Sequence, residues 1–256
     1  MNETAPSPRS SALALKELLQ LGQNKTKQEE RFLSVVAMHL DNENPPRELF
    51  VLCKICKLIE DVHMDIENLP FEPTLRNHYT EQMKPFEGLR NFKHAQMTVK
   101  QAEQQFLKPE HISGLVNIHG CTALTATKVI LSQDFEDLAS EFLLIRGRVA
   151  ESRFSDRFKR LLLDRIDQIT ILMKNSSVFD TEDLQREYEA LAGALVVSNE
   201  QKSKDQDGTF DRILNLVGKG LTLLKTVDGG LGSVISISEK AQEFLADVDN
   251  SDSDNS

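Results

Sequence analysis

The sequence predicts an all-α protein, a multi-helix domain with a linked C-terminal helical hairpin. Three observations favour this fold class. The strong helix formers Leu, Glu, Lys, Gln and Ala make up a large part of the composition, whereas Tyr is scarce and Trp is absent. Apolar residues recur at three-four spacing in several segments, as on one face of a helix. Proline, glycine and hydroxyl residues separate these segments at positions typical of helix ends.

The first two helices are expected between residues 11 and 39. Ser11 can cap a helix that ends at Gly22, a favourable residue just beyond a helix. Thr26 and Glu29 form a capping-box pattern before an apolar run through His39. This pattern predicts that the second helix begins near residue 26.

Prolines and a glycine divide the segment from 44 to 132. The Asn-Pro-Pro break at 44–46 predicts a new helix that reaches about residue 68. Its apolar stripe would consist of Leu49, Leu52, Cys56, Ile59, His63 and Ile66. Residues 69–90 are less regular, a helix is expected from 91 to 107, and Pro109 opens another. Gly120 then interrupts the chain before a segment at 124–132.

Three stronger helices are expected between residues 134 and 197. The first runs from Asp134 through Glu151, and Ser155 can cap the second, which reaches residue 175. Thr181 can cap the third, which reaches Val197. The second would turn one apolar row inward, made of Phe158, Leu162, Ile166, Ile169 and Met173.

The composition along the chain suggests five regions. Residues 1–11 are expected to be a disordered N-terminus, and residues 12–197 a main helical domain. Residues 198–209 are polar and lack periodicity, which predicts a linker. Residues 210–248 would form an apolar helical hairpin, and residues 249–256 an acidic disordered tail.

The predicted hairpin is the most apolar part of the chain. Its first helix carries a seam with alternating four-three spacing, Phe210, Leu214, Val217, Leu221 and Leu224. Glycines at 229–232 would end this helix, and residues 233–248 could form a second. The apolar face could pack on its own domain, pair with a copy or a partner, or lie on a membrane surface. Little local charge and no tryptophan disfavour the membrane.

Net charge and cysteine content limit the classes of protein to which this chain could belong. The formal net charge of −10 disfavours a general polyanion binder, although the acidic tail contributes part of it. Three cysteines suggest a reducing compartment rather than a disulfide framework. No signal peptide or membrane-spanning segment is evident. We therefore expect a cytoplasmic protein.

Cys53 and Cys56 form a C-x-x-C pair, which can bind a metal or undergo redox chemistry. A metal site would need two further ligands, and the sequence has no second C-x-x-C and no H-x-x-x-H pair. Both cysteines lie on or beside the apolar stripe of their helix, which favours small buried hydrophobes. We predict no metal and no cofactor.

Residues 118–131 resemble a helix-hairpin-helix element, in degenerate form. Ile118, Gly120, Cys121, Thr125, Ala126 and Ile130 fall at comparable places, with Thr122 where that family has its second glycine. The resemblance implies that backbone N–H groups near Gly120 meet a nucleic-acid phosphate.

A basic cluster follows at residues 146–165. For nucleic acid, its candidate residues are Arg146, Arg148, Arg153, Arg157 and Arg160. Asp156 and Asp164, each four residues from Arg160, also fit an ordinary solvated helix face.

No Walker A, H-E-x-x-H or G-x-S-x-G motif occurs in the sequence. A catalytic site assembled from distant residues stays an open alternative. We expect a non-catalytic interaction or assembly protein that uses its C-terminal segment to bind itself or a protein partner. Nucleic-acid binding through Gly120 and the arginine cluster is the alternative.

Overall fold

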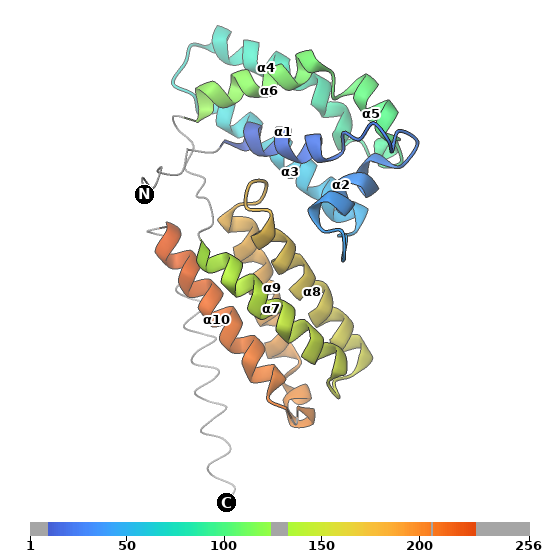
Figure 1. The fold of residues 1–256 in the computed structure, drawn as a ribbon. Helices are drawn as coiled ribbons and strands as arrows, with labels where there is room; N and C mark the ends of the chain where they lie inside the picture. Colours follow the sequence, from blue (N-terminus) through green and yellow to red (C-terminus); the bar gives the residue numbers. More distant parts are fainter. Residues whose placement is uncertain (1–9, 124–132, 206, 229–256) are drawn as a thin grey trace, which may run out of the picture. The chain divides into compact units, whose positions relative to one another are not determined.

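A computed structural model of the chain describes residues 10–123, 133–205 and 207–228 (Figure 1). Within these ranges it contains ten α-helices, three short 3-10 helices and no strand. The predicted all-α fold class is confirmed. Two compact units make up the chain, one formed by the chain up to residue 130 together with residues 175–179, the other by the rest.

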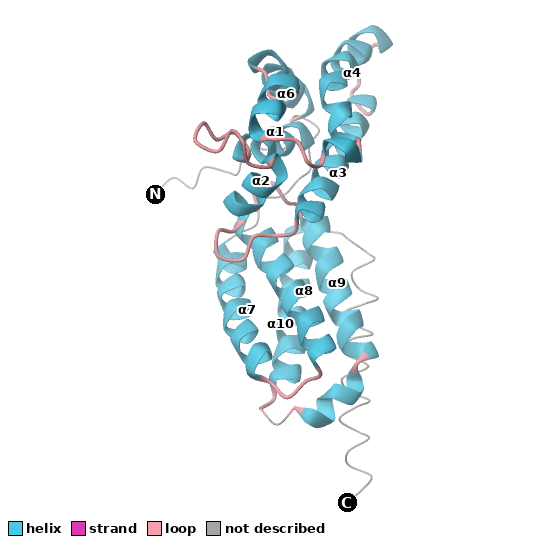
Figure 2. Ribbon diagram, turned by 90° about the vertical axis from the view of Figure 1, so that its right-hand side faces the viewer, coloured by secondary structure: helices cyan, strands magenta, loops and turns pink. Residues whose placement is uncertain are grey.

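The first unit is an irregular packing of six α-helices. They are α1 (Ser11–Leu21), α2 (Phe32–Leu40), α3 (Glu48–Glu67), α4 (Pro73–Glu87), α5 (Val99–Gln105) and α6 (Pro109–Thr122). Two 3-10 turns, η1 (Gly88–Arg90) and η2 (Phe92–His94), connect α4 to α5. Helix α1 packs against α2, α3 and α6, and α4 packs against α3 and α6 (Figure 2).

Several expected helix ends in this unit are corrected. Ser10, not Ser11, caps α1 with its side chain, and Gly22 follows the helix as predicted. The Thr26–Glu29 pattern does not cap a helix, because α2 begins only at Phe32. Asn24 instead accepts hydrogen bonds from the backbone N–H and hydroxyl of Thr26 in a local turn.

The middle of the unit also differs from the sequence prediction. The buried face of α3 is rotated, so that Leu49 is exposed while Val51, Ile55 and Val62 are buried. The expected helix at 91–107 is divided, because Thr98 forms a capping box with Gln101 and starts α5 there. An antiparallel bridge between Arg31 and Thr98 fixes this start.

The second unit is a four-helix bundle. Its helices are α7 (Gln133–Glu151), α8 (Asp156–Lys174), α9 (Thr181–Val197) and α10 (Thr209–Asp228), with the 3-10 helix η3 (Asn199–Lys204) before α10. Each helix packs on the next, and α10 closes the ring against both α9 and α7 (Figures 1 and 2). Short connections between successive helices produce an up-down arrangement.

The three helices predicted between 134 and 197 are confirmed to within one or two residues. The predicted inward row of α8 is also correct, since all five of its side chains are buried. The cap of α9 is Asp180 rather than Thr181, and Asp180 forms a reciprocal capping box with Asp183.

The predicted domain division does not coincide with the compact units. Residues 12–197 span both units, and α10 belongs with α7–α9. The segment predicted as a linker contains η3, whose Gln201 is buried and accepts a hydrogen bond from the backbone N–H of Ser155 at 3.0 Å. The second arm of the predicted hairpin, residues 229–248, and the tail at 249–256 lie outside the described residues.

Candidate functional site

The apolar seam of α10 faces the interior of the bundle. Its five residues are each at most 7% exposed, and they are Phe210, Leu214, Val217, Leu221 and Leu224. The aromatic rings of Phe210 and Phe158 lie 6.4 Å apart between centroids. The Asp205 carboxylate accepts a hydrogen bond from the backbone N–H of Phe210 at 2.7 Å, which satisfies a free donor at the start of the helix. The seam therefore packs on its own bundle.

Tyr188 explains one of the two glycines in α10. A Cβ atom at Gly220 would clash with Cζ and the hydroxyl of Tyr188. Tyr188 is completely buried, and its hydroxyl has no hydrogen-bond partner among the described residues. Burial raises the pKa of this phenol above its ordinary value. Gly220 lets the two helices approach closely at this point.

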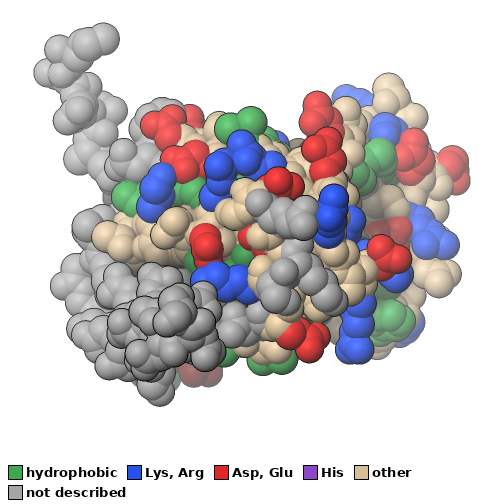
Figure 3. Space-filling view, turned by 90° about the horizontal axis from the view of Figure 1, so that it is seen from below, with side chains coloured by type: hydrophobic (Ala, Val, Ile, Leu, Met, Phe, Trp, Pro, Cys, Tyr) green, Lys and Arg blue, Asp and Glu red, His purple; other side chains and the backbone are tan. Residues whose placement is uncertain are grey.

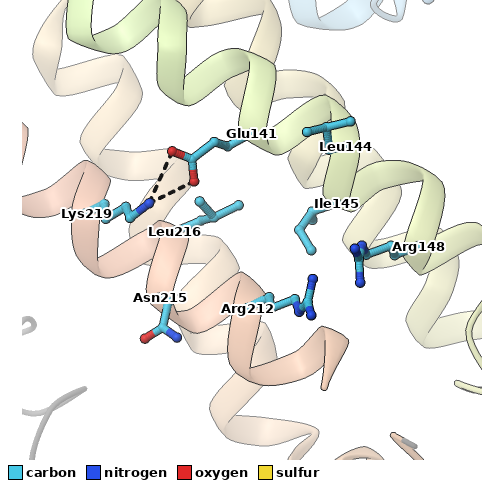
Figure 4. Close-up of a pocket in the computed structure, with 8 residues that line it drawn as sticks. All are labelled: Glu141, Leu144, Ile145, Arg148, Arg212, Asn215, Leu216 and Lys219. Carbon is cyan, nitrogen blue, oxygen red and sulfur yellow. Dashed lines mark hydrogen bonds and ion pairs between the residues drawn. The ribbon is translucent and has the colours of Figure 1, made fainter. Parts of the chain in front are cut away.

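The outer side of α10 borders a groove with α7 that encloses about 510 Å³ (Figure 4). Two turns of each helix line it, through Glu141, Leu144, Ile145 and Arg148 of α7 and Arg212, Asn215, Leu216 and Lys219 of α10. Ile145 and Leu216 are nearly buried, whereas Leu144 is 74% exposed. The groove thus has an apolar floor and an apolar side chain open to solvent.

The two ends of the groove differ in charge. At one end, Lys219 Nζ lies 2.8 and 3.1 Å from the carboxylate oxygens of Glu141, which joins α10 to α7. At the other end, Arg148 and Arg212 project from opposite walls (Figure 4). Neither guanidinium has an ion-pair partner among the described residues. Two neighbouring like charges favour a bound anion at this end.

The arginines of the predicted cluster differ in their contacts. The guanidinium of Arg146 makes a two-point ion pair with Asp167 at 2.5 and 3.2 Å, which joins α7 to α8. Arg160 Nε donates to the backbone oxygen of Asp156 at 3.4 Å. Arg153 and Arg157 are exposed, and Arg148 belongs to the groove. Seen from below, Lys and Arg side chains alternate with Asp and Glu (Figure 3).

Gly120 does not open a hairpin. It lies inside α6, which continues to Thr122, whose hydroxyl donates to the backbone oxygen of Ile118 at 2.9 Å. The predicted interruption at Gly120 is therefore corrected. The rest of the helix-hairpin-helix resemblance, at residues 124–131, lies outside the described residues.

The C-x-x-C pair lies within α3 and on its outer side. Cys53 is exposed and Cys56 is partly exposed, which corrects the expectation that both are buried. Burial, followed by the charge of Cys53, raises the pKa of the Cys56 thiol, which lowers the fraction of Cys56 present as reactive thiolate at neutral pH. Among the described residues, no group of three or more His, Cys, Asp or Glu side chains could hold a metal ion.

Sequence reasoning identified Arg148 but missed the groove. Arg212, Asn215 and Lys219 lie on the side of α10 opposite the seam, and their polar character was the available signal. The residues of α7 that line the groove follow only from the packing of the two helices.

Within the described ranges, no helix combines the length and the apolar character that crossing a membrane requires. Comparisons with protein-family models, curated proteins and solved structures found no significant match.

Proposed function

We propose that this chain is a non-catalytic helical interaction protein whose binding face is the groove between α7 and α10. The partner would be an acidic amphipathic helix of another protein. One observation carries the proposal: an apolar groove, open at Leu144, ends at two arginines that have no ion-pair partner among the described residues. The C-terminal helix thus contributes through its outer side, because its seam packs inside the bundle.

A helical partner fits the shape of this surface. The groove runs along two turns each of α7 and α10, so a third helix could lie between them with apolar side chains on Ile145 and Leu216. Carboxylates at one end of that helix would meet Arg148 and Arg212 in two-point hydrogen bonds. Apolar burial would supply affinity, and charge would set the orientation.

The test is capture of partners by the tagged full chain and by two charge-reversed variants. Arg148→Glu/Arg212→Glu changes the groove, whereas Arg153→Glu/Arg157→Glu makes the same change in net charge elsewhere on the bundle. We expect only the groove variant to weaken capture. Its dissociation constant for the purified partner should rise by at least about tenfold.

Two outcomes would overturn the proposal. Equal capture by the groove variant and the wild-type chain would show that the groove is not the binding face. Loss of capture after nuclease treatment, together with loss in the Arg153→Glu/Arg157→Glu variant, would favour nucleic acid instead.

A further inference from the structure

We infer that Cys53 and Cys56 form a two-thiolate site for a single soft monovalent cation, Cu(I). The site belongs to the first compact unit and is independent of the groove proposed above as the binding face. The sequence expectation of no metal rested on burial of both thiols, and their position on the outer side of α3 removes that reason. Three observations carry the inference: the spacing of the two cysteines, the number of available ligands and the charge interaction between the two sulfurs.

The spacing of the two cysteines fits a bridging ion better than a disulfide. Both lie within α3, three residues apart, so their side chains leave the same face of the helix. Cβ atoms at this spacing are about 5–6 Å apart, whereas a disulfide needs them at about 3.5–4.5 Å. Two metal–sulfur bonds of about 2.3 Å each span sulfurs that are up to about 4.6 Å apart. A bridging ion therefore requires less distortion of the helix than a disulfide does.

The number of available ligands selects the ion. Within the described residues, no third His, Cys, Asp or Glu side chain completes a metal-binding group with the two cysteines. His63, the one histidine of α3, lies about 10 Å beyond Cys56 along the helix axis. Its Nε2 is 2.6 Å from a carboxylate oxygen of Glu87. Structural zinc sites are almost always four-coordinate, whereas thiolates select soft ions and Cu(I) forms stable two-coordinate complexes.

The two sulfurs lie close enough for their charges to interact. Burial most of all, and then the charge of Cys53, raises the pKa of the Cys56 thiol. The charge of Arg90 acts in the opposite direction and favours the ionised thiol. Two thiolates at this distance repel each other, and a cation between them replaces that repulsion by attraction. Binding of Cu(I) therefore releases the thiol protons and stabilises the pair in its ionised form.

The experiment titrates the full, reduced chain with Cu(I) in the absence of oxygen, in competition with a chromophoric Cu(I) chelator, and native mass spectrometry counts the bound ions. Cys53→Ser and Cys56→Ser each remove one ligand. Cys121→Ser makes the same change at the third cysteine, which is partly exposed like Cys56. We expect one Cu(I) per wild-type chain. Either ligand variant should raise the dissociation constant by at least about a hundredfold, because the second thiolate no longer acts at high effective concentration. Cys121→Ser should leave it unchanged.

A second readout needs no substitution. Alkylation with iodoacetamide, followed by peptide mass spectrometry, measures the reactivity of each thiol in the wild-type chain. One equivalent of Cu(I) should protect Cys53 and Cys56 together and leave Cys121 as reactive as before. One equivalent of Zn(II) should protect the pair far less, because two thiolates supply only half of the ligands of a zinc site.

Three results would overturn the inference. A Cys121→Ser variant that binds Cu(I) as weakly as Cys53→Ser would place the ion elsewhere. Protection of only one cysteine of the pair would show that the two thiols do not share an ion. A complex of one Cu(I) with two chains in native mass spectrometry would show that the ion joins copies of the chain instead of the two thiols of one helix.

Discussion

At the scale of single residues, Gly218 and Gly220 serve different purposes although one residue separates them. Gly220 faces Tyr188 in the core, whereas a Cβ atom at Gly218 would have no described neighbour within 4 Å. The sequence shows two glycines that both weaken a helix. Only the packing of α10 on α9 reveals which of them is required.

This difference gives a matched pair of substitutions. We expect Gly220→Ala to lower the free energy of unfolding by about 2 kcal/mol, because the buried Tyr188 ring has no room to move. Gly218→Ala should raise it by up to about 1 kcal/mol through helix propensity alone. Urea unfolding measures both, and equal shifts would contradict the predicted orientation of α10.

The hydroxyl of Tyr188 provides a second prediction. Because this hydroxyl is buried with no hydrogen-bond partner in the described part of the chain, Tyr188→Phe should raise the free energy of unfolding by about 1 kcal/mol at neutral pH. Its pKa is raised in the folded chain, so the phenol ionises first in the unfolded chain, near pH 10. Stability should therefore fall above that pH, and less steeply in Tyr188→Phe. Denaturant titrations at pH 7 and pH 10.5 compare the two proteins, and a loss of stability at pH 7 would contradict the prediction.

At the scale of elements, strong periodic helices were predictable and their local caps were less so. The helices at 134–197 carry clear apolar rows, and their ends agree with the structure to within one or two residues. The capping pattern at Thr26 and Glu29 fails, whereas Thr98 and Asp180 do cap helices. The sequence has a capping pattern at each of these positions. Long-range contacts such as the bridge from Arg31 to Thr98 decide which pattern caps a helix.

The cap of α9 can be tested directly. Asp180 accepts a hydrogen bond from the backbone N–H of Asp183 at 2.9 Å and is only 9% exposed. We expect Asp180→Ala to lower the free energy of unfolding by about 1 kcal/mol. Asp180→Asn, which retains a hydrogen-bond acceptor at the cap, should keep most of that free energy of unfolding. Thermal unfolding followed by circular dichroism measures both, and equal losses would argue against a capping role.

At the scale of the whole molecule, the apolar character of α10 was predictable from the sequence, but the surface against which it packs was not. A seam of this kind fits a bundle, a self-association surface or a partner equally well, because periodicity says nothing about which surface covers it. The groove could not be predicted from the sequence either, because it combines residues of α7 and α10 that are distant in sequence.

Two truncations separate the role of α10 from that of the residues beyond it. A chain that ends at Asp228 should keep the cooperative unfolding of the bundle, because all four described helices of the bundle, α7 to α10, are retained. A chain that ends at Gly208 should lose it, since the inner faces of α7 and α9 would be exposed. Circular dichroism during thermal unfolding distinguishes the two, and cooperative unfolding of both would contradict this role.

The central claim is that α10 is the fourth helix of the bundle, with its apolar seam inside the bundle and the polar residues Arg212, Asn215 and Lys219 lining the groove. Native-state hydrogen exchange of the full chain tests this most directly. The amides of α10 between Ile213 and Leu224 should open with the same free energy as those in the middle of α8, as one cooperative unit. Exchange in α10 that is orders of magnitude faster than in α8 would contradict the account.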